Sequence, residues 1–149
     1  MEASDEPVAE ESLAFQEALS MLQSVAVPNS VDEDAAPEPF DEEHLDQIVA
    51  VLKQLAGELE AIRLISDVDK GGPRQRIRAE WVVSALNRGF DKEEVLQTGC
   101  LLLREMAFER SVARDVGRNN GIQVVIEAIE QYSFKKEVAV AGISALQML

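Results

Sequence analysis

The side chains that could carry chemistry are few in this sequence. His44 is the only histidine and Cys100 the only cysteine. A lone histidine forms neither a metal cluster nor, by itself, a catalytic triad. Cys100 stands among apolar residues, which favours a small core residue over a nucleophile. The sequence shows no catalytic constellation, so we predict a protein that is not an enzyme and that needs no cofactor or metal.

Two short segments are similar to known motifs, and neither carries a strong prediction. Residues 67–72 resemble the start of a calcium loop, but its fifth and twelfth positions hold Gly71 and Arg78 where oxygen ligands are needed. Gly89-Phe90, followed by a helix, resembles the loop of ubiquitin-associated domains. An internal repeat, described below, explains the same segment as a corner between two helices.

Three arginines form the clearest basic cluster. Arg110, Arg114 and Arg118 are four residues apart, so they share one face of a helix. A solvated helix face explains them, and contact with an anion or with an acidic segment is the alternative. Nucleic-acid binding usually shows a larger basic excess, whereas this chain has a net charge of −14. We therefore keep a nucleic-acid-associated function only as a second alternative.

The negative charge is concentrated at one end of the chain. Residues 1–52 carry 14 of the 28 acidic residues and no lysine or arginine. We predict a largely disordered acidic arm over residues 1–40, in which residues 26–40 form an extended linker with three prolines. Within the arm, residues 12–25 predict a short amphipathic helix, because apolar residues recur at helical spacing. These residues are Phe15, Ala18, Leu19, Leu22 and Val25.

A long helix is predicted from about Asp41 to Ser66. Apolar residues alternate spacings of three and four along it: Leu45, Ile48, Leu52, Leu55, Leu59 and Ile62. This heptad spacing is compatible with a coiled coil. The flanking positions are also apolar, and a stripe this wide suits a helix packed against two neighbours. We predict a capping helix in a helical domain over 41–149, with the coiled coil as the alternative.

The remaining sequence predicts five further helices and no strand. They cover about 76–88, 92–107, 111–118, 122–132 and 136–149, with turn-forming residues between them. The corner at Asn120-Gly121 is expected to use glycine for a positive φ angle. The predicted fold class is all-α.

Two segments of this region repeat each other at a spacing of 43 residues. Residues 79–106 align without a gap on 122–149, and identical residues recur at seven places. The pairs are Val82/Val125, Ala85/Ala128, Lys92/Lys135, Glu94/Glu137, Val95/Val138, Gly99/Gly142 and Leu103/Leu146. A period of about 40–47 residues is typical of helical solenoids. The matching glycines indicate close helix approach, because glycine inside a helix otherwise costs about 1 kcal/mol.

The pattern of Glu94-Val95, Gly99-Cys100, Leu103, Met106-Ala107, Val116-Gly117, Asn120-Gly121-Ile122 and Val125-Ile126 resembles the armadillo-repeat family. The resemblance covers about residues 76–149. It implies an armadillo-like α-solenoid, a right-handed superhelix with repeat units over about 71–107 and 108–149, the last truncated. It also implies third helices that line a concave groove, and members that bind peptides or proteins without catalysis.

The groove positions depart from the peptide-binding members of the family. Importin-α-like proteins carry a groove tryptophan followed four residues later by an asparagine, and those places fall here on Leu101 and Glu105, then on Ser144 and Met148. The importin mode of peptide binding is therefore not expected. We predict that these four residues contact a partner in another way.

The leading functional hypothesis is a non-enzymatic scaffold or adaptor that binds another protein or peptide. The alternative is a regulatory module whose acidic arm or amphipathic helix competes for the groove, with the arm contacting Arg110, Arg114 and Arg118. We expect no membrane span and a cytoplasmic location, with the nucleus as the alternative. The apolar final helix predicts a fragment of a longer solenoid or end-to-end self-association.

Overall fold

The structure is a computed structural model, and it describes residues 13–26, 42–65 and 77–149. These ranges form helices, and they contain no strand. The helices are α1 (Leu13–Ala26), α2 (Glu42–Ile65), α4 (Ala79–Arg88), α5 (Glu93–Met106), α6 (Arg110–Arg118), α7 (Gly121–Gln131) and α8 (Lys136–Met148). The all-α prediction is confirmed for the described residues. The calcium-like segment 67–72 and most of the acidic arm lie outside them.

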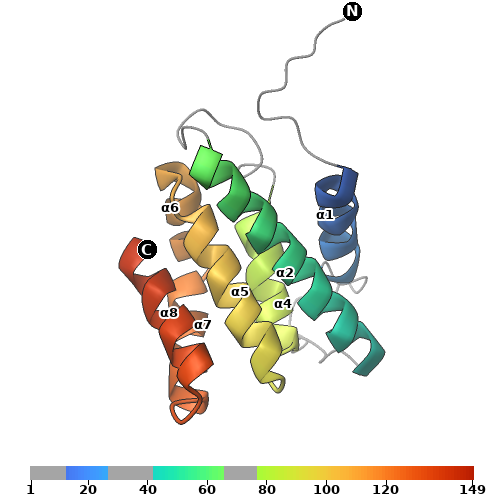
Figure 1. The fold of residues 1–149 in the computed structure, drawn as a ribbon. Helices are drawn as coiled ribbons and strands as arrows, with labels where there is room; N and C mark the ends of the chain where they lie inside the picture. The colour runs from blue at the N-terminus through green and yellow to red at the C-terminus, as the bar shows by residue number, and fades with distance from the viewer. Residues whose placement is uncertain (1–12, 27–41, 66–76) are drawn as a thin grey trace, which may run out of the picture.

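The helices form two layers (Figure 1). Helices α2, α5 and α8 lie side by side and run in the same direction, and α4 and α7 lie behind them and run in the opposite direction. Helix α5 is central because it packs against both α2 and α8. Helix α6 contacts α4, α5 and α7. Each copy of the sequence repeat therefore supplies one helix to each layer.

Helix α1 packs into the core of the helical domain. It contacts α2 and α4, and both Phe15 and Leu22 are fully buried. The sequence predicts residues 12–25 as part of the acidic arm, whereas in the structure this helix packs against both α2 and α4. The difference has a physical reason: an amphipathic stripe shows that a helix has a partner, but not which partner covers it.

The α2 seam is also buried within the chain. Ile48, Leu52, Leu55 and Leu59 have no exposed surface, and α1 and α5 cover them. A coiled coil with another chain would need this same seam. The described structure thus uses the stripe for packing into the helical domain.

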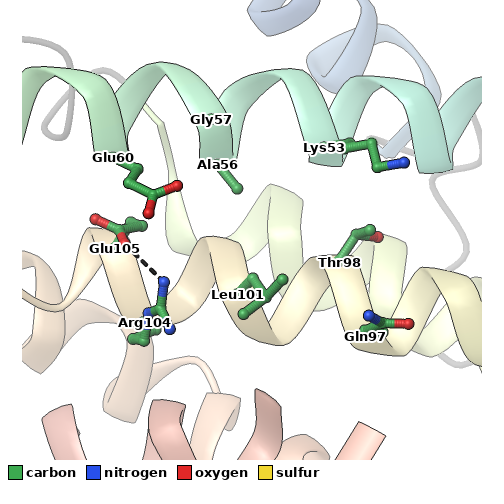
Figure 2. Close-up of a pocket in the computed structure, with 9 residues that line it drawn as sticks. All are labelled: Lys53, Ala56, Gly57, Glu60, Gln97, Thr98, Leu101, Arg104 and Glu105. Atoms are coloured by element: carbon green, nitrogen blue, oxygen red, sulfur yellow. Dashed lines mark hydrogen bonds and ion pairs between the residues drawn. The ribbon is translucent and has the colours of Figure 1, made fainter. Parts of the chain in front are cut away.

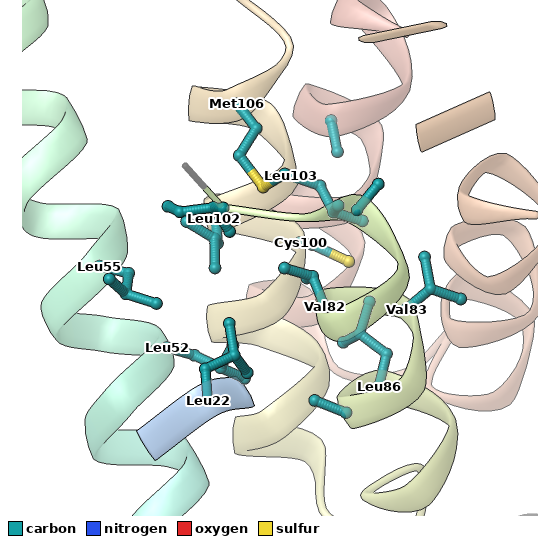
Figure 3. Close-up of a cluster of buried hydrophobic side chains, with 14 of the residues drawn as sticks. Leu22, Leu52, Leu55, Val82, Val83, Leu86, Cys100, Leu102, Leu103 and Met106 are labelled. Carbon is teal, nitrogen blue, oxygen red and sulfur yellow. The ribbon is translucent and has the colours of Figure 1, made fainter. Parts of the chain in front are cut away.

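The central helix α5 holds much of the hydrophobic core. Its buried apolar residues include Leu96, Cys100, Leu102, Leu103 and Met106, all without exposed surface. Figure 3 shows part of this cluster, in which Leu52 and Leu55 of α2 lie on one side of α5 and Val82 and Leu86 of α4 lie on another. Side chains from three elements thus meet around one helix, which fixes its orientation.

The two repeated glycines lie in matching surroundings. A Cβ atom added at Gly99 would collide with Leu86, and one added at Gly142 would come within 2.6 Å of Cγ1 of Ile129. Leu86 and Ile129 are equivalent positions of the repeat. Gly99 of α5 therefore allows α4 to approach closely, and Gly142 of α8 does the same for α7.

The corners between helices show the same equivalence. Nζ of Lys92 lies 3.7 Å from a carboxylate oxygen of Asp46 in the first turns of α2, and Nζ of its repeat partner Lys135 lies 3.2 Å from Glu93 of α5. The Tyr132 hydroxyl also donates a hydrogen bond of 2.9 Å to the carbonyl of Phe90. Each corner between helices is thus linked to the preceding part of the fold by polar contacts.

The tight corner before α7 differs in detail from its prediction. The positive φ angle, 66°, falls on Asn120, whereas glycine was expected to supply it. Asparagine tolerates this left-handed conformation better than most residues. Gly121 is needed for a different reason, because a Cβ there would collide with Val116 and lie 2.8 Å from its carbonyl oxygen.

Alanine substitution should separate the packing glycines from a glycine in open space. We expect Gly99→Ala to lower the free energy of unfolding by about 1–2 kcal/mol, because overpacking outweighs the gain in helix propensity. Gly142→Ala should cost less, since Ile129 is half-buried and can shift where the buried Leu86 cannot. Gly57→Ala should instead add about 0.5–1 kcal/mol, because nothing lies within 4 Å of its Cβ position. Urea unfolding would measure all three; equal effects at the three sites would contradict the packing.

Candidate functional site

The candidate site is a shallow groove between α2 and α5. It has a volume of about 200 Å³, and its lining comes from these two helices. Figure 2 shows Lys53, Ala56, Gly57 and Glu60 on α2, facing Gln97, Thr98, Leu101, Arg104 and Glu105 on α5. The groove lies where α2 and α5 run side by side in the same direction, and α2 places the small residues Ala56 and Gly57 along its edge.

The groove has an apolar floor between charged ends. Leu101 points from α5 toward Ala56, while Lys53 lies at one end and Glu60 at the other (Figure 2). The Thr98 hydroxyl donates to the Glu94 carbonyl at 2.6 Å, so it is used within its own helix. Gly57 lines the groove, and a Cβ there would meet no atom within 4 Å, so the groove is open beside this residue.

Glu105 is a buried charge at the edge of this groove. Its side chain is 1% exposed, and a carboxylate oxygen lies 2.9 Å from the Arg104 guanidinium. A buried carboxylate is destabilised without compensating partners, and Arg104 supplies one of opposite charge. The sequence predicts a partner contact at Glu105. In the structure its side chain is buried and paired with Arg104, which is itself partly exposed.

The other predicted groove residues do not gather with Leu101. Ser144 lies half-buried on α8, and Met148 lies half-buried near the end of that helix. Met148 instead lines a second hollow of about 570 Å³, together with Phe108, Arg110, Arg114 and Ile122. The structure thus brings Met148 to the arginine cluster and not to the groove between α2 and α5.

The arginine cluster is divided in the structure. Arg110 and Arg114 both line the second hollow, whereas Arg118 lies outside it and forms an exposed ion pair of 3.6 Å with Asp115. Within the described residues, Arg110 and Arg114 have no acidic group within ion-pair distance. Two of the three predicted arginines are therefore available to an anionic group at this hollow.

Several groove residues were not identified from the sequence. Lys53, Gly57 and Glu60 come from α2, and the family resemblance covered only residues 76–149, so no pattern pointed to them. A signal was present in Ala56-Gly57, where two small residues interrupt the larger side chains of α2. Arg104 was missed because its importance depends on the burial of its neighbour.

The residues considered for catalysis lie apart. No group of three or more His, Cys, Asp or Glu side chains that could hold a metal ion occurs within the described ranges. His44 is exposed at the start of α2, and Cys100 is fully buried in α5. Burial raises the pKa of the Cys100 thiol to about 12, so the thiol stays protonated.

Comparison with protein-family models, with curated proteins and with solved structures found no match to this chain. What the structure itself defines is an all-helical protein of two layers with a groove on one of them. Within residues 13–26, 42–65 and 77–149, no helix is long and apolar enough to cross a membrane. The armadillo resemblance stays a prediction from the sequence.

Cys100 should react slowly in the folded protein. At pH 8, we expect iodoacetamide to label the native chain roughly a thousandfold more slowly than the chain in denaturant, because the thiolate fraction falls with the raised pKa and burial blocks access. Mass spectrometry of timed samples would measure both rates. Rapid labelling of the native chain would show that α5 opens at this position.

The same thiol should make stability fall at alkaline pH. The pKa of Cys100 is raised on folding, so its contribution is complete below an unfolded pKa of about 8.5 and is lost as pH rises toward about 12. Between pH 7 and pH 10, we expect the unfolding free energy of the wild type to fall by about 2 kcal/mol more than that of Cys100→Ala. Parallel loss in both proteins, measured by urea unfolding, would contradict this linkage.

Proposed function

We propose that this protein is a scaffold or adaptor that binds an extended segment of another protein along the layer of α2, α5 and α8. The observation that carries the proposal is the groove between α2 and α5, with its apolar floor and its charged ends. Such a surface can take an apolar side chain over Leu101 and Ala56. Lys53 and Glu60 would then fix the direction of the bound segment through opposite charges.

The arrangement of the layer supports this proposal. Helices α2, α5 and α8 run in the same direction, so their outer faces present a repeated surface to one long ligand (Figure 1). The helices are held by buried contacts on their inner faces, which makes the outer surface rigid before binding. A preorganised surface loses less conformational entropy on binding than a flexible one.

The packing of α1 supports the scaffold over the alternative in which this amphipathic helix competes for the groove. A competing helix would have to leave a core in which Phe15 and Leu22 are fully buried. Exposing each such side chain costs about 1.5–3 kcal/mol. We therefore propose the scaffold, with α1 as part of its structure.

Filling the groove should abolish binding without unfolding the protein. Peptides selected from a random library on the wild-type chain should bind Gly57→Trp at least about tenfold more weakly, because the indole occupies the open space of the groove. Isothermal calorimetry would measure the affinities, and circular dichroism would check the helical content.

Ser20→Trp is the matched control. Ser20 is exposed on a helix, α1, and lines neither the groove nor the second hollow. This variant should bind the selected peptides like the wild type. Equal binding by all three proteins would place the peptide site elsewhere, and failure to select any peptide would argue against the scaffold.

A further inference from the structure

Large exposed apolar side chains are concentrated in the last unit of the structure. Among the described residues, Met21 on α1 is the one such side chain outside this unit. The others lie on α7, on α8 or in the turn between them: Ile122, Ile126, Phe134, Val140 and Ile143. We call the surface formed by Ile122, Ile126 and Ile143 the terminal face.

The sequence repeat allows the burial of the terminal face to be compared with that of the equivalent surface in the preceding copy. In the preceding copy, Ile122, Ile126 and Ile143 correspond to Ala79, Val83 and Cys100. These equivalents are 5%, 6% and 0% exposed, whereas Ile126 and Ile143 are 43% and 51% exposed. The same surface is therefore covered in one copy and open in the next.

In the first copy, the equivalent surface is covered by helices α6, α7 and α8. Val83 and Cys100 point away from α2, toward the side of α6–α8 (Figure 3). There α4 contacts α6 and α7, while α5 contacts α8. The terminal face thus repeats a surface that accepts helices, with larger apolar side chains than the copy that is already covered.

The charges at the start of α8 argue against a further helical unit packed on the last one as the last one packs on the unit before it. Lys92 forms an ion pair with Asp46 near the start of α2, and Lys135 forms one with Glu93 at the start of α5. The position equivalent to Glu93 in α8 is Lys136. A following unit built like these two would set its corner lysine against Lys136, and like charges would repel.

A head-to-tail stack of copies also lacks a matching surface. The exposed residues of α2 are largely polar, among them Glu42, Glu43, Gln47 and Gln54, and α1 adds Gln16 and Glu17. An apolar face is poorly matched to such a surface, but it is complementary to itself. A two-fold axis brings the same patch of two subunits together.

We propose that the terminal face binds the terminal face of a second copy and forms an isologous dimer. Ile126 of α7 and Ile143 of α8 lie at its centre, and the exposed Glu127, Glu130 and Lys136 give its surroundings charges of both signs. The interface lies on the last unit and does not include the groove between α2 and α5. The dimer therefore carries two grooves, and this inference stands apart from the proposed function.

The oligomeric state tests the proposal. Sedimentation equilibrium of the full chain over about 1–200 µM should show a dimer, and the double variant Ile126→Glu/Ile143→Glu should be monomeric, with a dissociation constant raised at least about a hundredfold. Both side chains are already half-exposed, so the helical content by circular dichroism should stay that of the wild type. If the double variant loses helicity, the single variant Ile143→Glu replaces it, because Ile143 is 51% exposed.

Met21→Glu is the matched control. It introduces the same charge at an exposed apolar residue of α1, and it should leave the dimer intact. A wild type that is monomeric throughout the concentration range would overturn the proposal. A dimer that survives the substitutions in the terminal face, or one that Met21→Glu disrupts, would show that another surface is used and would overturn it as well.

Discussion

The close approach of α4 to α5, and of α7 to α8, is the constraint on which the other packing depends. Gly99 admits Leu86, and Gly142 admits Ile129, so the two layers approach until their apolar side chains meet. With a Cβ at either position, the layers would have to separate or Leu86 and Ile129 would have to move. Close-packed interiors respond to such small changes in volume, which is why two glycines can control the distance between layers.

The groove follows from how α5 is held. Packing against α2, α4 and α8 buries most of α5 and leaves one narrow stripe, which includes Gln97, Leu101 and Arg104, at its surface. Arg104 cannot move freely within this stripe because it compensates the charge of Glu105. A residue with almost no exposed surface thereby influences the charge that a ligand would meet.

The periodic features of the sequence predicted the local structure well, and the contacts between distant elements less well. Apolar spacing located the helices of the described residues, and Gly99 and Gly142 lie in the equivalent surroundings that the repeat predicted. The packing of α1 and the burial of Glu105 were not predicted, since periodicity shows which face is covered but not by what. Lys53 and Glu60 were missed because the groove arises only when α2 lies beside α5.

Contacts in this fold run mainly between adjacent units, since α5 joins α2 on one flank to α8 on the other. In such a one-dimensional arrangement, stability is close to a sum of unit terms and nearest-neighbour terms. Helix α5 contacts α2, α4, α6, α7 and α8, whereas α8 contacts mainly α5 and α7. Amide hydrogens should therefore exchange most slowly in α5 and progressively faster toward α8, so that the chain opens from one end in steps and not as a whole.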